Sequence, residues 1–395
     1  MPLWCGGRPS RAEVAAARIS RGLMTTKRPT TAPPTLRVAS LEDAAQIRRL
    51  EEAHFGITRP FDDWRGLWLK NPLWPRLGER WPIAWVLEDR DGRVVGALLN
   101  IPTLYHFRGR ELINATGRGW TVDAAFDGYA LWLLDEFYNQ ADADLFVNNT
   151  INRLAEAPHQ HYASPIPLGQ WNTGSYWITD YRGFAKKALQ RFGVPFPGLF
   201  GPPASASLWL RDKLSAQRLP TAQRDIAYET VPDFDPRFEE FWQEQLEQSP
   251  DKLLAARDLK TLTWHYAVPL RAGRLWIYTA LRHGKLRAYC VFKREDVDGI
   301  FRMRLVDYQT LQNDSDLLVG MLAQAIRRCA EEKLHVLELL GAGLPGLESF
   351  DRCAPYRRKR PHWCYYFRAA DPVLAAQLHA PGAWIPSMYD GDGSF

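Results

Sequence analysis

Hydrophobic and polar positions follow a pattern along this chain that occurs twice. In the first copy, apolar runs at Trp81–Asp89 and Arg93–Asn100 flank a short turn that contains a glycine. In the second copy, runs at Arg274–Leu281 and Lys285–Lys293 flank a turn of the same kind. Two apolar runs on either side of such a turn predict a β-hairpin. Because the two copies lie about half of the chain apart, the sequence predicts two similar lobes.

The elements after each hairpin come in the same order: a strand, a helix and a second strand. Apolar residues three and four positions apart, such as Leu134 and Phe137, place one face of each helix against a sheet. The predicted elements are strands at 116–123, 145–148, 301–309 and 335–340, and helices at 130–140 and 314–333. The fold class predicted is therefore α/β (α+β), with a mixed, mostly antiparallel sheet flanked by helices in each lobe.

Composition and charge narrow the function classes. The 395 residues suit two domains. A net charge of +5 permits an anionic ligand such as a nucleotide or CoA and does not require nucleic acid. No stretch approaches the roughly 18–20 apolar residues that span a membrane. Five cysteines without a CxxC pair argue against a disulfide framework and favour the cytoplasm. Cys353, His362 and Cys364 lack a fourth ligand, so no metal site is predicted.

The chain is expected to divide into four parts. Residues 1–35 are rich in Arg, Ala, Ser, Thr and Pro, and they are interpreted as a disordered leader or as the result of a mis-assigned start codon before Met24. Residues 36–193 form the first lobe and residues 225–395 the second. The segment between them, 194–224, is predicted to be a linker because its first part is rich in Pro and Gly.

The order of the predicted elements resembles the GNAT acyltransferase fold, over about residues 36–160 and, less closely, over about residues 225–350. Several details resemble tandem-lobed GNAT proteins related to the Fem-type aminoacyltransferases. These details are Trp64 with Asn71-Pro72, Trp264-His265-Tyr266, Leu305–Thr310 and the closing Trp384–Asp392. The resemblance implies an acyl-CoA donor, such as acetyl-CoA, and a small-molecule amine acceptor.

The resemblance also implies a pyrophosphate site in the loop before the central helix, where backbone N–H groups face the phosphates. Gly128 and Ala130 match the family's pattern, whereas Ala125 replaces its leading Gln or Arg. Asp123 and Asp127 place negative charge beside the expected phosphates. The candidate cofactor-binding residues are Val122, Ala125, Phe126, Asp127, Gly128, Tyr129, Ala130, Asn148 and Asn149. The second lobe's loop, 310–316, has no glycine, so that lobe is expected to be degenerate and to hold no cofactor.

Amide formation from a thioester needs a base for the amine and a proton donor for the leaving thiolate. Asp123 at a strand end and Glu88 in the second strand are candidate bases, and Tyr162 is the candidate proton donor. Each of these side chains also suits an ordinary surface role.

Three functions stay open at this point. The first is an acyl-CoA-dependent N-acyltransferase acting on an amino sugar or amino acid derivative. The second is a catalytically silent tandem-GNAT protein that binds a small molecule or a partner between its lobes, which the acidic loop favours. The third is a Fem-like aminoacyl transfer from tRNA, which predicts strongly salt-dependent RNA binding.

Overall fold

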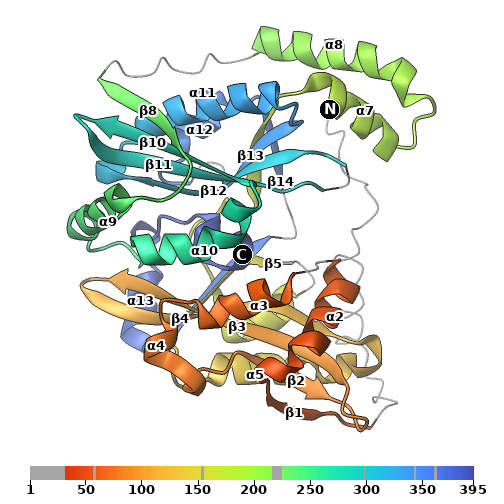
Figure 1. Ribbon diagram of the computed structural model, residues 1–395, viewed down its shortest axis with the longest axis vertical. Coiled ribbons are helices and arrows are strands. Elements are labelled where there is room, and N and C mark those ends of the chain that lie inside the picture. Colours follow the sequence, from red (N-terminus) through yellow and green to blue (C-terminus); the bar gives the residue numbers. More distant parts are fainter. Residues whose placement is uncertain are drawn as a thin grey trace.

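The chain folds into two lobes, each built on one β-sheet. The computed structural model describes residues 32–56, 59–152, 155–215, 225–297, 299–341, 344–359 and 363–395. Figure 1 shows the two sheets one above the other, with helices α3 (Phe61–Leu69) and α10 (Leu259–Arg271) facing each other at the junction. Residues 1–31 of the predicted leader lie outside the part of the chain that the structure describes.

The sheet of lobe one is mixed and mostly antiparallel. Its one parallel contact among the described strands joins β4 to β5. In spatial order the strands are β1 (Thr35–Val38), β2 (Ala84–Glu88), β3 (Val94–Phe107), β4 (Arg110–Val122), β5 (Leu145–Ile151), β15 (Cys364–Ala369) and β6 (Ser164–Pro165), with β9 (Leu254–Ala255) beside β3.

The sheet of lobe two has the same character, and its parallel contact among the described strands joins β12 to β13. In spatial order the strands are β14 (Tyr356–Lys359), β7 (Thr173–Ile178), β13 (Val336–Leu340), β12 (Arg302–Thr310), β11 (Lys285–Arg294), β10 (Leu275–Arg282) and β8 (Ile226–Val231). The predicted α/β class with two mixed sheets is confirmed.

The two lobes exchange strands. β7 lies within the predicted first lobe, 36–193, yet it pairs with β13 and β14 in the sheet of lobe two. β15 lies within the predicted second lobe, 225–395, yet it pairs with β5 and β6 in the sheet of lobe one. The predicted division of the chain therefore differs from the membership of the sheets, because each half completes the sheet of the other.

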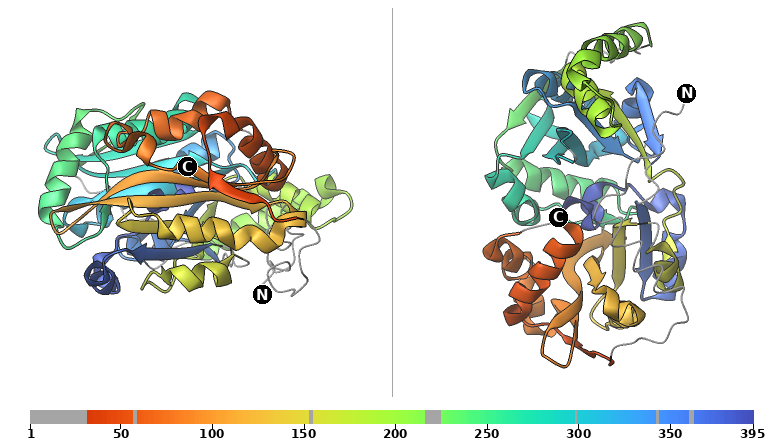
Figure 2. Two further views of the ribbon diagram at one scale, coloured as in Figure 1. Left: turned by 90° about the horizontal axis from the view of Figure 1, so that it is seen from below. Right: turned by 90° about the vertical axis from the view of Figure 1, so that its right-hand side faces the viewer.

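Helices cover the faces of both sheets (Figures 1 and 2). Apolar faces of α2 and α5 pack on the sheet of lobe one, and that of α11 packs on the sheet of lobe two. The helices are α2 (Ala44–Phe55), α3, α4 (Trp74–Leu77), α5 (Ala130–Asn139), α6 (Glu156–Tyr162), α7 (Tyr181–Arg191), α8 (Pro197–Ser215), α9 (Pro236–Gln248), α10, α11 (Asp316–Glu331), α12 (Glu348–Cys353) and α13 (Pro372–Leu378).

Short 3-10 turns connect several of these elements. They are η1 (Leu41–Asp43), η2 (Gly78–Arg80), η3 (Ala124–Tyr129), η4 (Leu311–Asn313), η5 (Pro381–Ala383), η6 (Met388–Asp390) and η7 (Asp392–Ser394). The last two lie at the junction of the lobes, where Figure 1 places the C-terminus.

The predicted linker is largely helical where the structure describes it. α8 begins at Pro197 and continues through Pro202 and Pro203 to Ser215. A proline ring removes one helical N–H donor but is tolerated where neighbouring structure supports the helix. Here α8 packs along α7, and the two form a helical hairpin beside lobe two (Figure 2).

Candidate active site

A bulge in β4 opens the sheet of lobe one. Leu99 is opposite Arg118 on β4, but Ala97 is opposite Thr121, so Gly119 and Trp120 together face a single residue of β3. Gly119 has a φ of 67°, which a residue with a side chain adopts only under strain. A bulge bends a strand and takes backbone groups out of the regular ladder.

Beside this bulge β4 and β5 separate. Their parallel pairing is confined to Asn114 with Leu145 and Ala115 with Phe146. Two residues further along, a side chain replaces the backbone pairing: Asn148 Oδ1 accepts a hydrogen bond of 2.8 Å from the N–H of Gly117. Asn148 therefore marks the point at which the opening begins.

The C-terminal segment, which contains η6 and η7, lies in the wider part of the opening. There η7 packs against β4 and β5. Asn149 Nδ2 donates to the carbonyl oxygens of Ser387 and Met388, both at 3.1 Å, and its Oδ1 accepts from Gly393 N at 2.9 Å. Asp392 accepts hydrogen bonds from the backbone of Asn149 and from Thr150. Both asparagines predicted to face a cofactor thus contact protein groups at the edge of the opening.

The loop after β4 presents small residues to solvent. It begins at Asp123, continues as η3 and leads into α5. Val122, Phe126 and Ala130 are buried, Tyr129 is half-buried, and Ala125 and Gly128 are exposed. Asp127 is only 9% exposed, and Asp123 Oδ1 lies 3.4 Å from His54 Nε2. The acidic groups that argued against phosphate binding are therefore turned inward or placed beside an imidazole.

The structure does not bring the three candidate catalytic residues together. Glu88 accepts hydrogen bonds from Arg37, at the edge strand β1. The Tyr162 hydroxyl donates to Asp135 on α5, and burial, with that contact, raises the pKa of Tyr162 to about 12. Asp123 alone of the three adjoins the loop.

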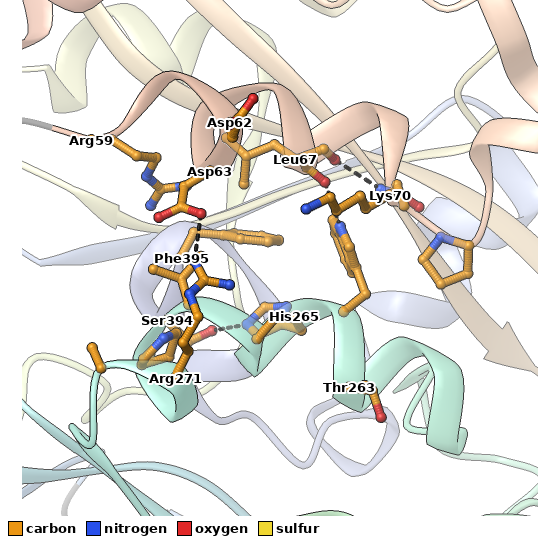
Figure 3. A pocket seen from close by; sticks show the side chains of 18 of the residues that line it. Arg59, Asp62, Asp63, Leu67, Lys70, Thr263, His265, Arg271, Ser394 and Phe395 are labelled. Carbon is orange, nitrogen blue, oxygen red and sulfur yellow. Dashed lines mark hydrogen bonds and ion pairs between the residues drawn. The ribbon is translucent and has the colours of Figure 1, made fainter.

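A cavity of about 960 Å³ lies between the lobes, lined mainly by α3 and α10. These helices contain the repeated motifs around Trp64 and Trp264. The Trp264 indole N–H donates to the carbonyl oxygen of Gly66 at 2.9 Å, and Arg271 pairs with Asp63 at 2.5 Å. Figure 3 shows Arg271 and Asp63 reaching toward each other from opposite walls. The two copies of the repeat therefore form the two walls of one cavity.

Basic side chains gather at the inner end of this cavity. Arg59 and Lys293 line it, and both are electrostatically coupled to Arg118, which stands on β4 beside the bulge. Burial, reinforced by the charge of Arg118, lowers the pKa of Arg59 to about 9. Burial also lowers the pKa of Lys293 to about 8; Glu295 opposes this shift, and nearby guanidinium groups add to it. The cavity thus reaches the C-terminal turn η7, which itself packs against β4.

A buried histidine adjoins these cations. His265 lines the cavity, and its Nε2 lies 2.6 Å from Ser394 Oγ (Figure 3). Burial and the charges of Lys293, Arg257 and Arg59 hold the pKa of His265 well below its usual value, so its imidazole is neutral. Lys293 Nζ donates to the carbonyl oxygen of Ser394 at 2.8 Å. Ser394 therefore lies between a neutral imidazole and an ammonium group.

A buried ion network holds the C-terminal segment in place. Arg257 is 2% exposed, and it donates to both carboxylate oxygens of Asp307 and to Asp390 Oδ1 at 2.9 Å. Ser387 Oγ donates to Asp307, while the Tyr105 hydroxyl of lobe one donates to the carbonyl oxygen of Asp390. Residues of both lobes thus fix the segment that fills the opening.

The comparisons with known proteins rest on structure. No protein-family model matches the sequence, and no curated relative is similar to it. N-myristoyltransferase from Saccharomyces cerevisiae, solved with bound myristoyl-CoA and inhibitors, is 13% identical, with a TM-score of 0.51 over 93% of this chain and 87% of that one. A GCN5-related N-acetyltransferase from Kribbella flavida is 10% identical, with a TM-score of 0.50 over 87% of this chain and 73% of that one.

The chain has the GNAT fold. The predicted fold is therefore confirmed over most of the chain, while the relation to Fem-type aminoacyltransferases stays a prediction. Among the described residues, no His, Cys, Asp and Glu side chains form a group arranged to hold a metal ion. His362 lies outside the described residues.

Several residues of the cavity were not predicted from the sequence. Arg59 lies on a loop and Lys293 on a strand far away along the chain, so no local motif links them. Ser394 lies close to the end of the given sequence. The one usable signal was the repeat itself, because its two copies contain Trp64 and Trp264 on the facing walls.

Proposed function

We propose that this protein is an acyl-CoA-dependent N-acyltransferase in which lobe one holds the acyl donor and the inter-lobe cavity holds the amine acceptor. The observation that carries the proposal is the meeting of two features at one place. The cationic inner end of the cavity adjoins Arg118, next to the bulge at which the sheet of lobe one opens. An acceptor in the cavity would therefore lie near the strand that is proposed to hold the donor, with the turn η7 between them.

The loop of lobe one suits a pyrophosphate. The exposed Ala125 and Gly128 let phosphate oxygens approach the backbone, and the following helix α5 directs its positive end there. Because Asp127 is buried, its carboxylate does not face this surface. The likeness to a yeast enzyme solved with myristoyl-CoA supports the same choice of donor. When bound, the donor supplies a thioester acyl group.

The charges of the cavity specify an acceptor with an anionic group. Seven Lys or Arg residues line the cavity, against three acidic residues. Asp63 pairs with Arg271, and Glu295 pairs with Arg304 outside the lining and, at 3.9 Å, with Lys293. Arg294 pairs with Asp296, so the cations left in excess are Arg59, Lys70, Lys260 and Arg274, against Asp62. Cations without enough counter-charge favour an anionic ligand. We therefore infer that the acceptor carries a carboxylate or phosphate beside its amine.

The same charges prepare the amine for attack. Nearby positive charge and burial both disfavour an ammonium ion, so the pKa of a bound amine falls and less base strength is needed. The amine nitrogen bonds to the acyl carbon as the carbon–sulfur bond breaks, the amine proton passes to water, and the thiolate takes a proton from solvent. Backbone N–H groups at Gly119 and Trp120, outside the regular ladder, are the proposed oxyanion donors.

Release of free CoA thiol tests the reaction. Acetyl-CoA and longer acyl-CoAs would be supplied with amino acids and phosphorylated amino sugars, each matched to its methyl ester or its uncharged amino sugar. We expect transfer to the anionic amines with kcat/KM about tenfold or more above their uncharged partners. Equal rates for both sets would contradict the acceptor class alone. No turnover with any acyl-CoA would contradict the reaction.

A second candidate is binding without chemistry. The observation that favours it is the C-terminal segment, because Asp392 and its hydrogen bonds occupy part of the opening between β4 and β5. In that case acyl-CoA would bind but no thiol would be released with any amine. Thiol-independent transfer from aminoacyl-tRNA would instead support the third, Fem-like function.

A further inference from the structure

The helical hairpin of α7 and α8 turns the apolar side of α8 outward. The residues of α8 that face the body of the protein recur at helical spacing: Gly201, Ala204, Ser205, Leu208 and Asp212. Asp212 is fixed there by hydrogen bonds from the hydroxyls of Tyr181 at 2.8 Å and Tyr356 at 2.6 Å. The inner face therefore combines small residues with Leu208, which packs on lobe two, and the hydrogen-bonded Asp212.

The outer face is apolar and unpartnered within the described chain. Its stripe contains Leu199, Pro203, Ala206, Leu210 and Leu214, again at helical spacing. Leu199 is 71% and Leu214 80% exposed. Around the stripe lie further exposed apolar side chains, namely Phe192, Phe196, Phe200 and Trp209. Nearly half of the large exposed hydrophobic residues of the described chain thus belong to this one hairpin.

The hairpin as a whole is positively charged, although Arg211 faces the body of the protein, with its guanidinium 4.7 Å from the centre of the Tyr356 ring. Residues 181–215 contain six Lys or Arg and one acidic residue, Asp212, which is buried. Their excess of five positive charges equals the net charge of the whole chain. Lys213 lies with its ammonium 5.8 Å from the centre of the Trp209 ring.

We propose that the α7–α8 hairpin docks on a lipid surface that contains anionic headgroups. An interfacial helix buries Trp, Phe and Leu at the level of the headgroups and keeps Lys and Arg beside them, and this hairpin offers both. A second copy of the chain is the poorer occupant, because face-to-face pairing of two hairpins would bring cations against cations. Figure 2 shows the hairpin projecting from lobe two, away from the inter-lobe junction.

The attachment would be peripheral. In the part of the chain that the structure describes, none of the helices combines the length and the apolarity needed to cross a membrane. The hairpin lies on lobe two, whereas the proposed donor loop lies on lobe one, so the proposed chemistry does not depend on it. Docking would place the enzyme next to acyl donors or acceptors that partition into membranes.

Flotation with vesicles tests the proposal on the full chain. The vesicles would be phosphatidylcholine alone or phosphatidylcholine with phosphatidylserine. We expect the protein to float with the anionic vesicles, and Leu199→Ser with Leu210→Ser to weaken partitioning about tenfold or more. Lys186→Glu with Lys213→Glu should weaken it as well and reduce its salt dependence. The matched control is Val373→Ser, since Val373 is also exposed, at 65%, but lies on α13.

Two results would overturn the proposal. The first is failure to float with anionic vesicles, or equal flotation of the wild type and the Leu199→Ser, Leu210→Ser variant. The second is a dimer in light scattering that the same two substitutions dissociate, since the apolar face would then be covered by another copy. Thermal unfolding of each variant checks that the hairpin is folded, and the outward position of both leucines predicts no loss of Tm.

Discussion

The two lobes share a fold, and they differ most at the turn after the central strand. Both central strands carry a bulge, at Gly119 and Trp120 in β4 and at Val306 in β12. In lobe one the turn is open, with Ala125 and Gly128 exposed. In lobe two, α12 packs beside the start of α11, and Ser349 donates a hydrogen bond of 2.6 Å to Asp316, the first residue of α11.

This difference supports the proposed division of tasks between the two lobes. An open turn with small residues offers backbone N–H groups to a phosphate, whereas an aspartate on the same helix end repels one. Lobe two contributes instead the buried pair of Arg257 and Asp307, which fixes the C-terminal segment against lobe one. We therefore propose that lobe one binds the donor and that lobe two stabilises the junction.

The largest expected effect is on the free energy of unfolding, and it comes from the buried ion network at the junction. Arg257→Met should lower the free energy of unfolding by roughly 3–5 kcal/mol, because it leaves the carboxylates of Asp307 and Asp390 buried without a cation. Urea denaturation measures this. The control is Arg237→Met, which removes only partly exposed ion pairs and should cost less than about 1 kcal/mol. Equal losses of stability in both variants would contradict the claim that this network stabilises the junction more than a surface ion pair does.

Both lobes bury neutral histidines, and protonation of these rings should destabilise the protein in acid. Burial lowers the pKa of His159 to about 3, and it holds the pKa of His265 well below the usual value. Between these values and the unfolded pKa of about 6.5, the unfolded state binds more protons, so stability falls as pH falls. His159 alone should cost about 2 kcal/mol at pH 5.

Unfolding free energies at pH 7 and pH 5 test this expectation. His159→Asn keeps an acceptor for the Tyr138 hydroxyl, which lies 2.8 Å from Nδ1, and removes the titrating ring. The variant should lose the share of about 2 kcal/mol that His159 contributes, while His265 and His335, whose pKa burial also lowers, keep theirs. An unchanged slope would show that His159 is not buried as a neutral ring.

A substitution at the acceptor end of the cavity should weaken the affinity for the acceptor. Lys293→Met removes a buried donor to the acceptor's anionic group, so KM for the acceptor should rise about tenfold or more while kcat changes little. Lys285→Met is the control, since Lys285 is exposed on the same strand. A fall in kcat at constant KM would instead place Lys293 in the chemical step.

The pKa of Lys293 should make anion binding at this site depend on pH. With a pKa of about 8, Lys293 is charged below pH 8 and loses its proton above it, so anion binding should weaken severalfold between pH 8 and 9. Because an anion favours the charged form, binding should take up protons in this range. Calorimetric titration with sulfate in buffers of different ionisation enthalpy measures the uptake; release of protons would contradict the assignment.

The smallest effect is expected at Asp123. Its carboxylate lies 3.4 Å from His54 rather than in the cavity, so Asp123→Asn should change kcat less than about twofold. A loss of turnover without a loss of donor affinity would return Asp123 to the role of base that its place at the strand end first indicated.

Much of the fold could be predicted because its signals are local. The hairpins around Gly92 and Gly284 follow from alternating apolar runs and turn residues, and α5 follows from its apolar stripe. The exchange of β7 and β15 could not be predicted, because a strand of about six residues does not encode which sheet it joins. α8 was missed because Pro202 and Pro203 indicate a break that packing on α7 overrides.

Part of the candidate site could likewise be predicted from the sequence, and part could not. The loop from Asp123 to Ala130 was predicted because it is continuous in sequence, although the burial of Asp127 was not visible there. The cavity depends on side chains from α3, α10 and the C-terminal segment, which only the folded chain brings together. Long-range contacts of this kind leave no periodic signal in one sequence.

Calorimetric titration of acetyl-CoA into three proteins tests the central claim, that the turn of lobe one holds the donor. The proteins are the wild type, Gly128→Glu and the control Gly169→Glu, which adds the same charge at another exposed glycine with open space around it. The account predicts that the wild type and Gly169→Glu bind acetyl-CoA alike, that Gly128→Glu does not, and that acetyl-pantetheine binds far more weakly than acetyl-CoA. Equal binding by all three proteins would contradict it.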